Sequence, residues 1–236
     1  MLKNLLLCFA IISAGSVRSQ SLLGAWQAEY SENGKPMKSV LIFADGYQVA
    51  TQYSAVTGAF LATNGGYWSL EGSKMTEKVE FDSEYPEHVG NTNSFEISLT
   101  DDTLSIIGQK ILWKRVDDGT PGALQGAWLM SGRKRDGEIQ ARDTNRPRKT
   151  MKILSGTRFQ WIAYNTETKE FKGTGGGTYT TVDGKYTETI EFFSRDDSRV
   201  GASLPFTFEL IDGDWHHSGF SSKGVPLYEI WSLRKE

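Results

Sequence analysis

The chain has 236 residues and a formal net charge of −3, from 26 basic and 29 acidic side chains. A mildly acidic protein lacks the excess positive charge of a nucleic-acid binder or of a protein that attaches to an anionic membrane surface. Six prolines, 25 glycines and 12% aromatic residues favour a β-rich globular fold.

The first 19 residues have the pattern of a secretory signal peptide, with a positive charge at Lys3, an apolar run at 5–12 and a small-residue cleavage site ending at Ser19. The apolar run is shorter than the roughly 20 residues that span a bilayer, so no transmembrane segment is expected. Cys8 is the only cysteine and lies inside this run, without the preceding small residue that lipid modification needs. We therefore expect an exported protein, periplasmic or secreted, that folds without disulfides.

The rest of the chain contains one sequence pattern twice. The triplet Gly-Ala-Trp at 24–26 returns at 126–128, a glycine-rich stretch at 64–68 returns at 175–179, and Trp113 corresponds to Trp231. This self-similarity predicts two copies of one fold, copy one at 20–117 and copy two at 123–236. The turn-rich linker at 118–122 is too short to let the copies move far apart.

Each copy contains short alternating segments bounded by Gly, Asp or Asn, without helical periodicity. Eight short antiparallel strands can close into an up-and-down barrel, which removes exposed edges. The predicted fold is therefore all-β, with two tandem eight-stranded antiparallel up-and-down barrels. The strands of copy two are expected at 126–131, 150–154, 159–164, 173–182, 186–194, 206–211, 215–220 and 228–233.

The two Gly-x-Trp triplets resemble those on the first strand of the lipocalins and the wider calycin group. The resemblance is closest to compact lipocalin-like domains of unknown function in exported bacterial proteins, and it covers nearly all of the chain after residue 19. In that family a basic residue near the end of the last strand often stacks on the tryptophan. The resemblance implies this role for Arg115 in copy one and Arg234 in copy two, although the spacing from the last-strand tryptophan differs by one residue.

Alternation along the fifth strand predicts which side chains face each barrel interior. Each copy places a glutamate, Glu77 or Glu188, on the apolar face, where a carboxylate needs a partner, water or a ligand. The alternative is a glutamate at the barrel mouth that is solvated or paired to an arginine. The predicted inward residues are Met75, Glu77, Val79 and Phe81 in copy one, and Tyr186, Glu188, Ile190 and Phe192 in copy two.

Copy two carries aromatic and titratable side chains where copy one has aliphatic ones, such as Ile106 against His217 and Ile111 against Glu229, while Trp161 replaces Val49. Mostly aromatic walls with a few polar groups are typical of a small-molecule site, although aromatic side chains also simply fill barrels. Copy one, in contrast, predicts a filled core. The predicted ligand-binding residues are Trp161, Tyr179, Tyr186, Glu188, Trp215, His217, Glu229 and Trp231.

No metal or other cofactor is expected. His216 and His217 point to opposite faces of one strand, and no cysteine remains after the leader to complete a metal site. The glycines at 173–177 lack the lysine and the following helix of a phosphate loop, so they predict a bend or bulge in the barrel wall. The sequence also has no Gly-x-Ser-x-Gly elbow of a serine hydrolase.

The connection at 133–149 carries seven basic and three acidic residues. It joins the first two strands of copy two, where lipocalins usually carry the lid over the barrel mouth. One interpretation is a charged, solvated loop. In the other, Arg142, Arg146 or Arg148 attracts an anionic ligand or pairs with a glutamate at the mouth.

Three classes of function fit this pattern. The favoured one is an exported binding protein that holds a small apolar, planar or glycosidic ligand in the second barrel. An enzyme would use Glu188 or Glu229 with His217 as acid and base. A protein-interaction module would have a packed barrel and bind another cell-envelope protein through its loops. The pattern favours binding over catalysis.

Overall fold

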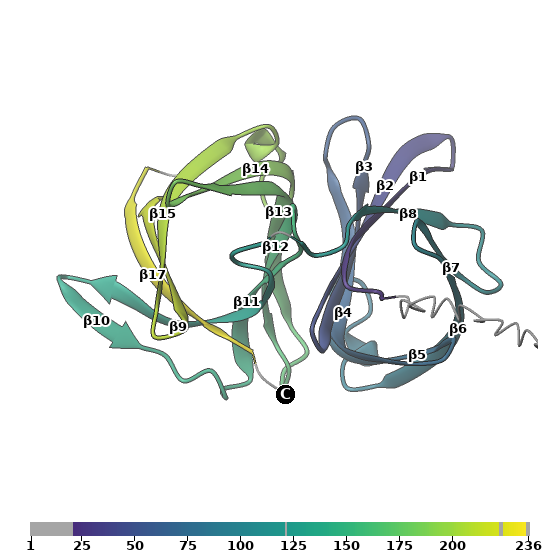
Figure 1. The fold of residues 1–236 in the computed structure, drawn as a ribbon, viewed down its shortest axis with the longest axis horizontal. Coiled ribbons are helices and arrows are strands. Elements are labelled where there is room, and N and C mark those ends of the chain that lie inside the picture. Colours follow the sequence, from purple (N-terminus) through teal and green to yellow (C-terminus); the bar gives the residue numbers. More distant parts are fainter. Residues whose placement is uncertain (1–20, 121, 222–223, 235–236) are drawn as a thin grey trace, which may run out of the picture.

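The computed structural model describes residues 21–120, 122–221 and 224–234. The predicted signal peptide, with Cys8, lies outside the described residues. Within the described ranges, no helix is long and apolar enough to cross a membrane. Two β-barrels lie side by side (Figure 1).

Barrel 1 is closed by eight antiparallel strands that neighbour one another in chain order. Its first hairpin has a two-residue turn, Asn33-Gly34, in which both residues have positive φ, as a type I′ turn requires. Pairing of the first strand with the last closes the barrel. The elements are β1 (Gly24–Glu32), β2 (Lys35–Ala44), β3 (Tyr47–Ser54), β4 (Phe60–Glu71), β5 (Lys74–Asp82), the short 3-10 helix η1 (Pro86–His88), β6 (Thr92–Leu99), β7 (Thr103–Ile106) and β8 (Leu112–Asp117).

Barrel 2 repeats this order and adds one strand, β10, which pairs with the far end of β9. Pairing of β9 with β17 closes it. The predicted fold class, two tandem eight-stranded antiparallel barrels, is confirmed. The elements are β9 (Gly126–Arg135), β10 (Glu138–Ala141), β11 (Arg148–Leu154), β12 (Arg158–Asn165), β13 (Phe171–Val182), β14 (Lys185–Phe193), η2 (Asp197–Arg199), β15 (Ser203–Ile211), β16 (Asp214–Phe220) and β17 (Pro226–Leu233).

The glycine-rich stretches of β4 and β13 contain a bulge, as predicted for residues 173–177. The register between β13 and β14 shifts between Gly176 and Gly177, and that between β4 and β5 shifts between Gly65 and Gly66. A Cβ on Gly177 would lie 2.0 Å from the carbonyl oxygen of Thr189, so the close approach of the two strands requires glycine there.

The bulge reverses the direction of the side chains at the ends of β5 and β14. Phe81 and Phe192 were predicted to face the barrel interiors, and this prediction is wrong. Both lie in the hydrophobic cluster between the barrels, because the extra residue at the bulge shifts the alternation by one. In barrel 2 it is Phe193 that faces inward.

A hydrophobic cluster lies between the barrels and includes the outer faces of β2, β3, β11 and β12. Beside it, the Gln160 amide accepts a hydrogen bond from Thr51 at 2.6 Å and donates one to Thr63 at 3.0 Å. The barrels therefore share a packed and hydrogen-bonded interface. Its buried members are Val40, Ile42, Ala44, Tyr47, Val49, Tyr53, Phe81, Ala127, Leu129, Met151, Ile153, Ile162, Tyr164 and Phe192.

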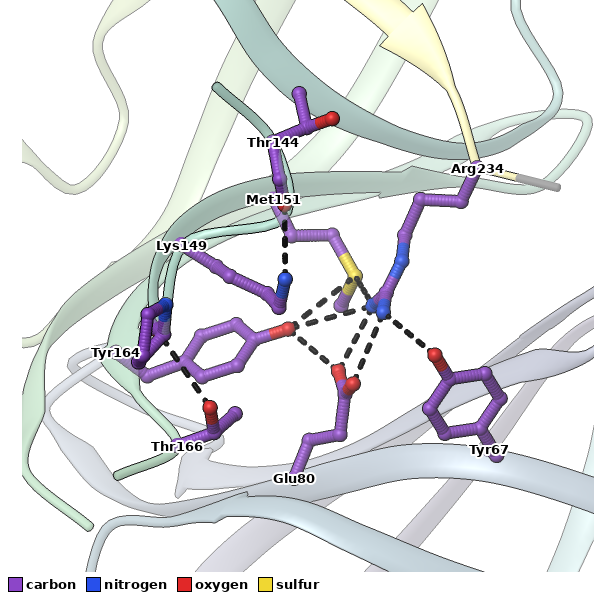
Figure 2. Close-up of polar contacts among 9 residues, drawn as sticks. Tyr67, Glu80, Thr144, Lys149, Met151, Tyr164, Thr166 and Arg234 are labelled. Carbon is purple, nitrogen blue, oxygen red and sulfur yellow. Dashed lines mark hydrogen bonds and ion pairs between the residues drawn. The ribbon is translucent and has the colours of Figure 1, made fainter. Parts of the chain in front are cut away.

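Arg234 forms the polar centre of this interface (Figure 2). Its guanidinium binds both carboxylate oxygens of Glu80, at 2.8 and 2.9 Å, and Tyr164 donates a hydrogen bond to the same carboxylate at 2.6 Å. The guanidinium also lies 4.0 Å from the ring centroid of Tyr47. Residues from both barrels thus surround one buried ion pair.

The expected stacking of a basic residue on the Gly-x-Trp tryptophan is confirmed in barrel 1, where the Arg115 guanidinium lies 4.0 Å from the ring centroid of Trp26. The same expectation for Arg234 and Trp128 is wrong, because Arg234 contacts barrel 1 instead. Arg115 follows the last-strand tryptophan by two residues and Arg234 by three. An odd spacing places the arginine on the opposite face of an extended chain.

Candidate functional site

Barrel 2 contains a cavity of about 260 Å³ that is open on one side. Five of the eight predicted ligand-binding residues line it: Trp161, Glu188, His217, Glu229 and Trp231. They come from β12, β14, β16 and β17, so side chains from distant parts of the sequence converge on one space. The remaining wall is mainly apolar and includes Met130, Ile190, Phe193, Leu204, Phe206 and Leu227.

The other three predicted residues, Tyr179, Tyr186 and Trp215, are buried in the aromatic cluster of barrel 2 and do not line this cavity. The hydroxyl of Tyr179 donates to the carbonyl oxygen of Ser155, while that of Tyr186 donates to Glu188 at 2.9 Å. The hydroxyl of Tyr186 therefore positions the Glu188 carboxylate in the cavity wall, and the hydroxyl of Tyr179 stabilises the backbone of the barrel.

Lys152 is a charged cavity residue that the sequence did not predict. Its ammonium nitrogen lies 2.7 Å from Oε1 of Glu188, and both side chains are less than 10% exposed. The same nitrogen lies about 5 Å from the ring centroids of Tyr186, Trp215 and Trp231, a distance at which cation–π attraction stabilises an ammonium group. A buried lysine here is thus held by one carboxylate and an aromatic cage.

Comparison of the two copies contains the signal for Lys152. In barrel 2 Trp128 pairs with Lys152, and in barrel 1 the corresponding Trp26 pairs with Leu41. A lysine in barrel 2 therefore takes the position of an inward leucine in barrel 1. The same registers correct the equivalence proposed for Trp161. Lys152 pairs with Trp161 on the third strand, and Leu41 pairs with Ala50, so Trp161 corresponds to Ala50 and not to Val49.

His217 and Glu229 are opposite each other on β16 and β17. Burial, and then the charge of Lys152, lower the pKa of His217 well below its usual value, so the ring is neutral at pH 7. Burial raises the pKa of Glu229, although the charge of Lys152 opposes the shift. Its carboxylate accepts a hydrogen bond from the indole of Trp231 at 3.3 Å.

Two buried nitrogens near the cavity have no hydrogen-bond partner among the described residues: Nδ1 of His217 and Nε1 of Trp215. Most buried polar atoms in folded proteins are hydrogen-bonded, so such atoms call for an explanation. Both atoms are inaccessible to solvent, so neither faces the open space of the cavity, although other atoms of His217 line it. His216 points to the opposite face and contacts Tyr228 at 2.7 Å, as the alternation predicted.

The prediction that barrel 1 is a filled core is wrong. It holds a cavity of about 280 Å³, and Leu104, Ile106 and Ile111 form part of the wall. These aliphatic side chains stand where barrel 2 has a tryptophan, a histidine and a glutamate, and they do not fill the space at the centre of the barrel. Polar members of the same wall are Ser39, Gln48, Gln52, Asn64, Glu77 and Gln109.

Glu77 corresponds to Glu188 but has no lysine beside it. Its carboxylate accepts a hydrogen bond from the side-chain amide of Gln48. Burial, with a smaller contribution from the charge of Asp82, raises the pKa of Glu77 to about 7, against the opposing hydrogen bond of Gln48. The free-energy cost of burying a glutamate is therefore reduced differently in the two barrels. In barrel 1 Glu77 binds a proton more tightly, and in barrel 2 Glu188 forms an ion pair with Lys152.

We expect Glu77→Gln to remove a pH dependence of stability. The folded protein keeps the proton of Glu77 up to about pH 7, whereas the unfolded chain releases it near 4.5, so the wild-type free energy of unfolding falls as the pH rises between these values. The loss amounts to about 3 kcal/mol at most. Urea unfolding at pH 5 and pH 8.5 should show a smaller decrease for Glu77→Gln than for wild type. Equal decreases in the two proteins would refute this role of Glu77.

The described parts of the chain contain no group of three or more His, Cys, Asp or Glu side chains arranged to hold a metal ion. The cavity of barrel 2 presents an ion pair, a neutral imidazole, a carboxyl group and several aromatic rings.

Residues 123–234, which contain all of barrel 2, match the model of a protein family described as a domain of unknown function (DUF4488). No curated protein matches the chain. With its two closed eight-stranded barrels, the chain fits a tandem barrel protein whose second barrel is similar to that family.

Proposed function

We propose that this is an exported, lipocalin-like binding protein and that barrel 2 holds a small planar ligand, apolar or glycosidic. The observation that carries the proposal is the aromatic cavity of barrel 2, whose wall also includes His217, Glu229 and the Lys152–Glu188 ion pair. Export rests on the sequence pattern of residues 1–19. Aromatic walls with a few convergent polar groups are the usual composition of small-molecule sites.

The cavity volume favours a small ligand. At about 260 Å³ it lies just below the range of roughly 300–1,000 Å³ that is common for drug-sized ligands. The space suits a molecule with one or two rings. Flat rings can stack on Trp161 and Phe193, whose own rings meet edge to face at 5.5 Å.

The charges in the wall favour a neutral ligand. Lys152 and Glu188 neutralise each other at 2.7 Å, and Glu188 also receives the hydroxyl of Tyr186. A charged ligand would leave a charge without a partner in a largely apolar space, which is costly. Glu229 and His217 remain to form hydrogen bonds with hydroxyl, carbonyl or amide groups of the ligand.

The geometry favours binding over acid–base catalysis. An enzyme of the kind considered from the sequence would have Glu188 or Glu229 within hydrogen-bond reach of His217. Among the described residues no hydrogen bond joins His217 to either glutamate, and Oε1 of Glu188 is occupied by Lys152 and Tyr186. We therefore assign these polar groups to holding a ligand.

Thermal unfolding in the presence of cavity-sized compounds tests the proposal. Indole, 4-nitrophenol, 4-nitrophenyl glucoside and 4-hydroxybenzoate would be compared, the last as the charged member. A compound that binds the folded state alone adds about 2.7 kcal/mol of stability at 100 times its Kd. We expect at least one neutral compound to raise the melting temperature and 4-hydroxybenzoate to raise it less.

A matched pair of variants then assigns the site. Leu227 lines the cavity of barrel 2, and Gln109 lines that of barrel 1; each lies four residues before the last-strand tryptophan. Leu227→Trp should fill the cavity of barrel 2 and abolish the stabilisation, whereas Gln109→Trp should leave it unchanged. Stabilisation that survives Leu227→Trp, or the lack of any stabilising compound, would reject the proposal.

A further inference from the structure

The first hairpin of barrel 2 carries an insertion that barrel closure does not need. Barrel 1 makes the same connection with the two residues Asn33-Gly34. Barrel 2 instead extends β9, adds β10 and returns through residues 142–147 before β11 begins. Because both barrels close, the insertion serves something other than the fold.

The insertion forms a cleft of about 450 Å³ whose charged lining is strongly cationic. Arg133 comes from β9, Arg148 from the start of β11, and Arg142 and Arg146 from the segment between β10 and β11. The acidic residue in the lining is Asp143. Four guanidinium groups therefore share a concave surface with a single carboxylate.

Arg142 is held in place by the fold. It is half-buried, and its guanidinium donates to the carbonyl oxygen of Arg148 at 3.0 Å and to the hydroxyl of Thr150 at 3.3 Å. Burial and the neighbouring charges of Arg148, Arg133 and Arg146 lower its pKa, although an arginine stays charged at neutral pH. The structure thus keeps one cation fixed beside three others.

The protein balances these charges only in part, because Glu229 lies opposite Arg133 across β9 and β17 and interacts with its charge. In the part of the chain that the structure describes, the one ion pair of these four arginines joins Arg146 to Asp143 at 3.9 Å, with both side chains more than half exposed. None of the four forms an ion pair with Glu188 or Glu229 there, so the expected alternative of pairing with a mouth glutamate is not what the structure shows. The remaining positive charge favours the binding of an external anion.

We infer that this arginine cleft binds a multiply charged oxyanion, such as the phosphate, sulfate or polycarboxylate group of a small molecule. A guanidinium presents several N–H donors in a planar fork that matches two oxygens of such a group, and charge-assisted hydrogen bonds are the stronger kind. The site is distinct from the neutral cavity proposed above, although Met130 lines both. The inference stands without the proposed function of barrel 2.

Isothermal titration with pyrophosphate, sulfate and citrate, at constant ionic strength in chloride, tests this inference and ranks the three oxyanions. Arg146→Gln with Arg148→Gln removes two cleft charges. Lys134→Gln with Arg135→Gln removes two charges from the same insertion at exposed positions outside the cleft, and is the matched control. We expect saturable binding that weakens about tenfold or more in the cleft variant and stays nearly unchanged in the control.

Two outcomes would overturn the inference: no saturable binding of any of the three anions, or an equal loss in the cleft and control variants, which would indicate general attraction to a basic hairpin. Melting temperatures of all variants check that they fold. If the double variant of the cleft is unstable, Arg133→Gln, at an exposed position of β9, replaces it with the same expectation.

Discussion

Lys152→Met is expected to lower the free energy of unfolding by about 3–5 kcal/mol, because it leaves the carboxylate of Glu188 buried without its ion-pair partner. The ammonium of Lys152 lies 2.7 Å from that carboxylate, and the side chains are 8% and 6% exposed. Tyr186 donates the remaining hydrogen bond seen on the same oxygen. Urea unfolding at pH 7, followed by tryptophan fluorescence, measures the loss.

Two further variants separate the ion pair from simple packing. The double variant Lys152→Met/Glu188→Gln removes both charges, and replacing a buried pair by neutral groups is often nearly neutral for stability. Leu41→Met makes a similar change at the corresponding position of barrel 1 and should cost less than about 1.5 kcal/mol. If the double variant is as unstable as the single one, the ion pair is not what Lys152 contributes.

Glu80→Ala is expected to destabilise the protein by a similar amount, about 3–5 kcal/mol, through the interface between the barrels. It removes both hydrogen bonds that Arg234 makes with the carboxylate, and the Arg234 side chain is only 4% exposed. Glu71→Ala, at an exposed glutamate at the end of β4, is the control and should change stability little. Equal effects of the two substitutions would contradict the role of the interface pair.

The cost of Glu80→Ala should depend on pH. Burial alone would raise the pKa of Glu80, but the hydrogen bonds and charge of Arg234, together with the hydroxyl of Tyr164, outweigh it and lower the pKa below 4.5. A carboxylate whose pKa is lower in the folded protein than in the unfolded chain stabilises the fold fully at a pH above the unfolded-state pKa. This stabilisation is lost as the pH falls through the folded-state pKa. The difference between wild type and Glu80→Ala should therefore be full at pH 7 and shrink towards pH 3, as urea unfolding at both values would show.

Local patterns in the sequence were enough to predict the barrels. The repeat, the alternation and the turn residues predict both sets of eight strands, because strand formation and hairpin geometry depend on neighbouring residues. The same alternation placed Glu188, His217, Glu229, Trp161 and Trp231 inside barrel 2, where all five line the cavity. The run of glycines at 173–177 predicted the bulge.

The direction of the side chains after the bulge and the register between strands could be determined only from the structure. Alternation alone cannot follow a strand past an inserted residue, so Phe81 and Phe192 were assigned to the wrong face. Trp161 was aligned with the wrong residue of copy one, and Lys152 was overlooked, although cross-strand pairing places it opposite Trp128. Register is decided by two strands together and not by either one alone.

What the sequence determined by itself was the kind of fold and the inward face of most strands, since these follow from contacts between residues close in the chain. Only the tertiary structure decided that Arg234 joins Glu80 of the other barrel, that Lys152 reaches Glu188, and that barrel 1 also holds a cavity. Each of these depends on the distance between side chains far apart in sequence and on the space that packing leaves between them. Local periodicity carries no information on either quantity.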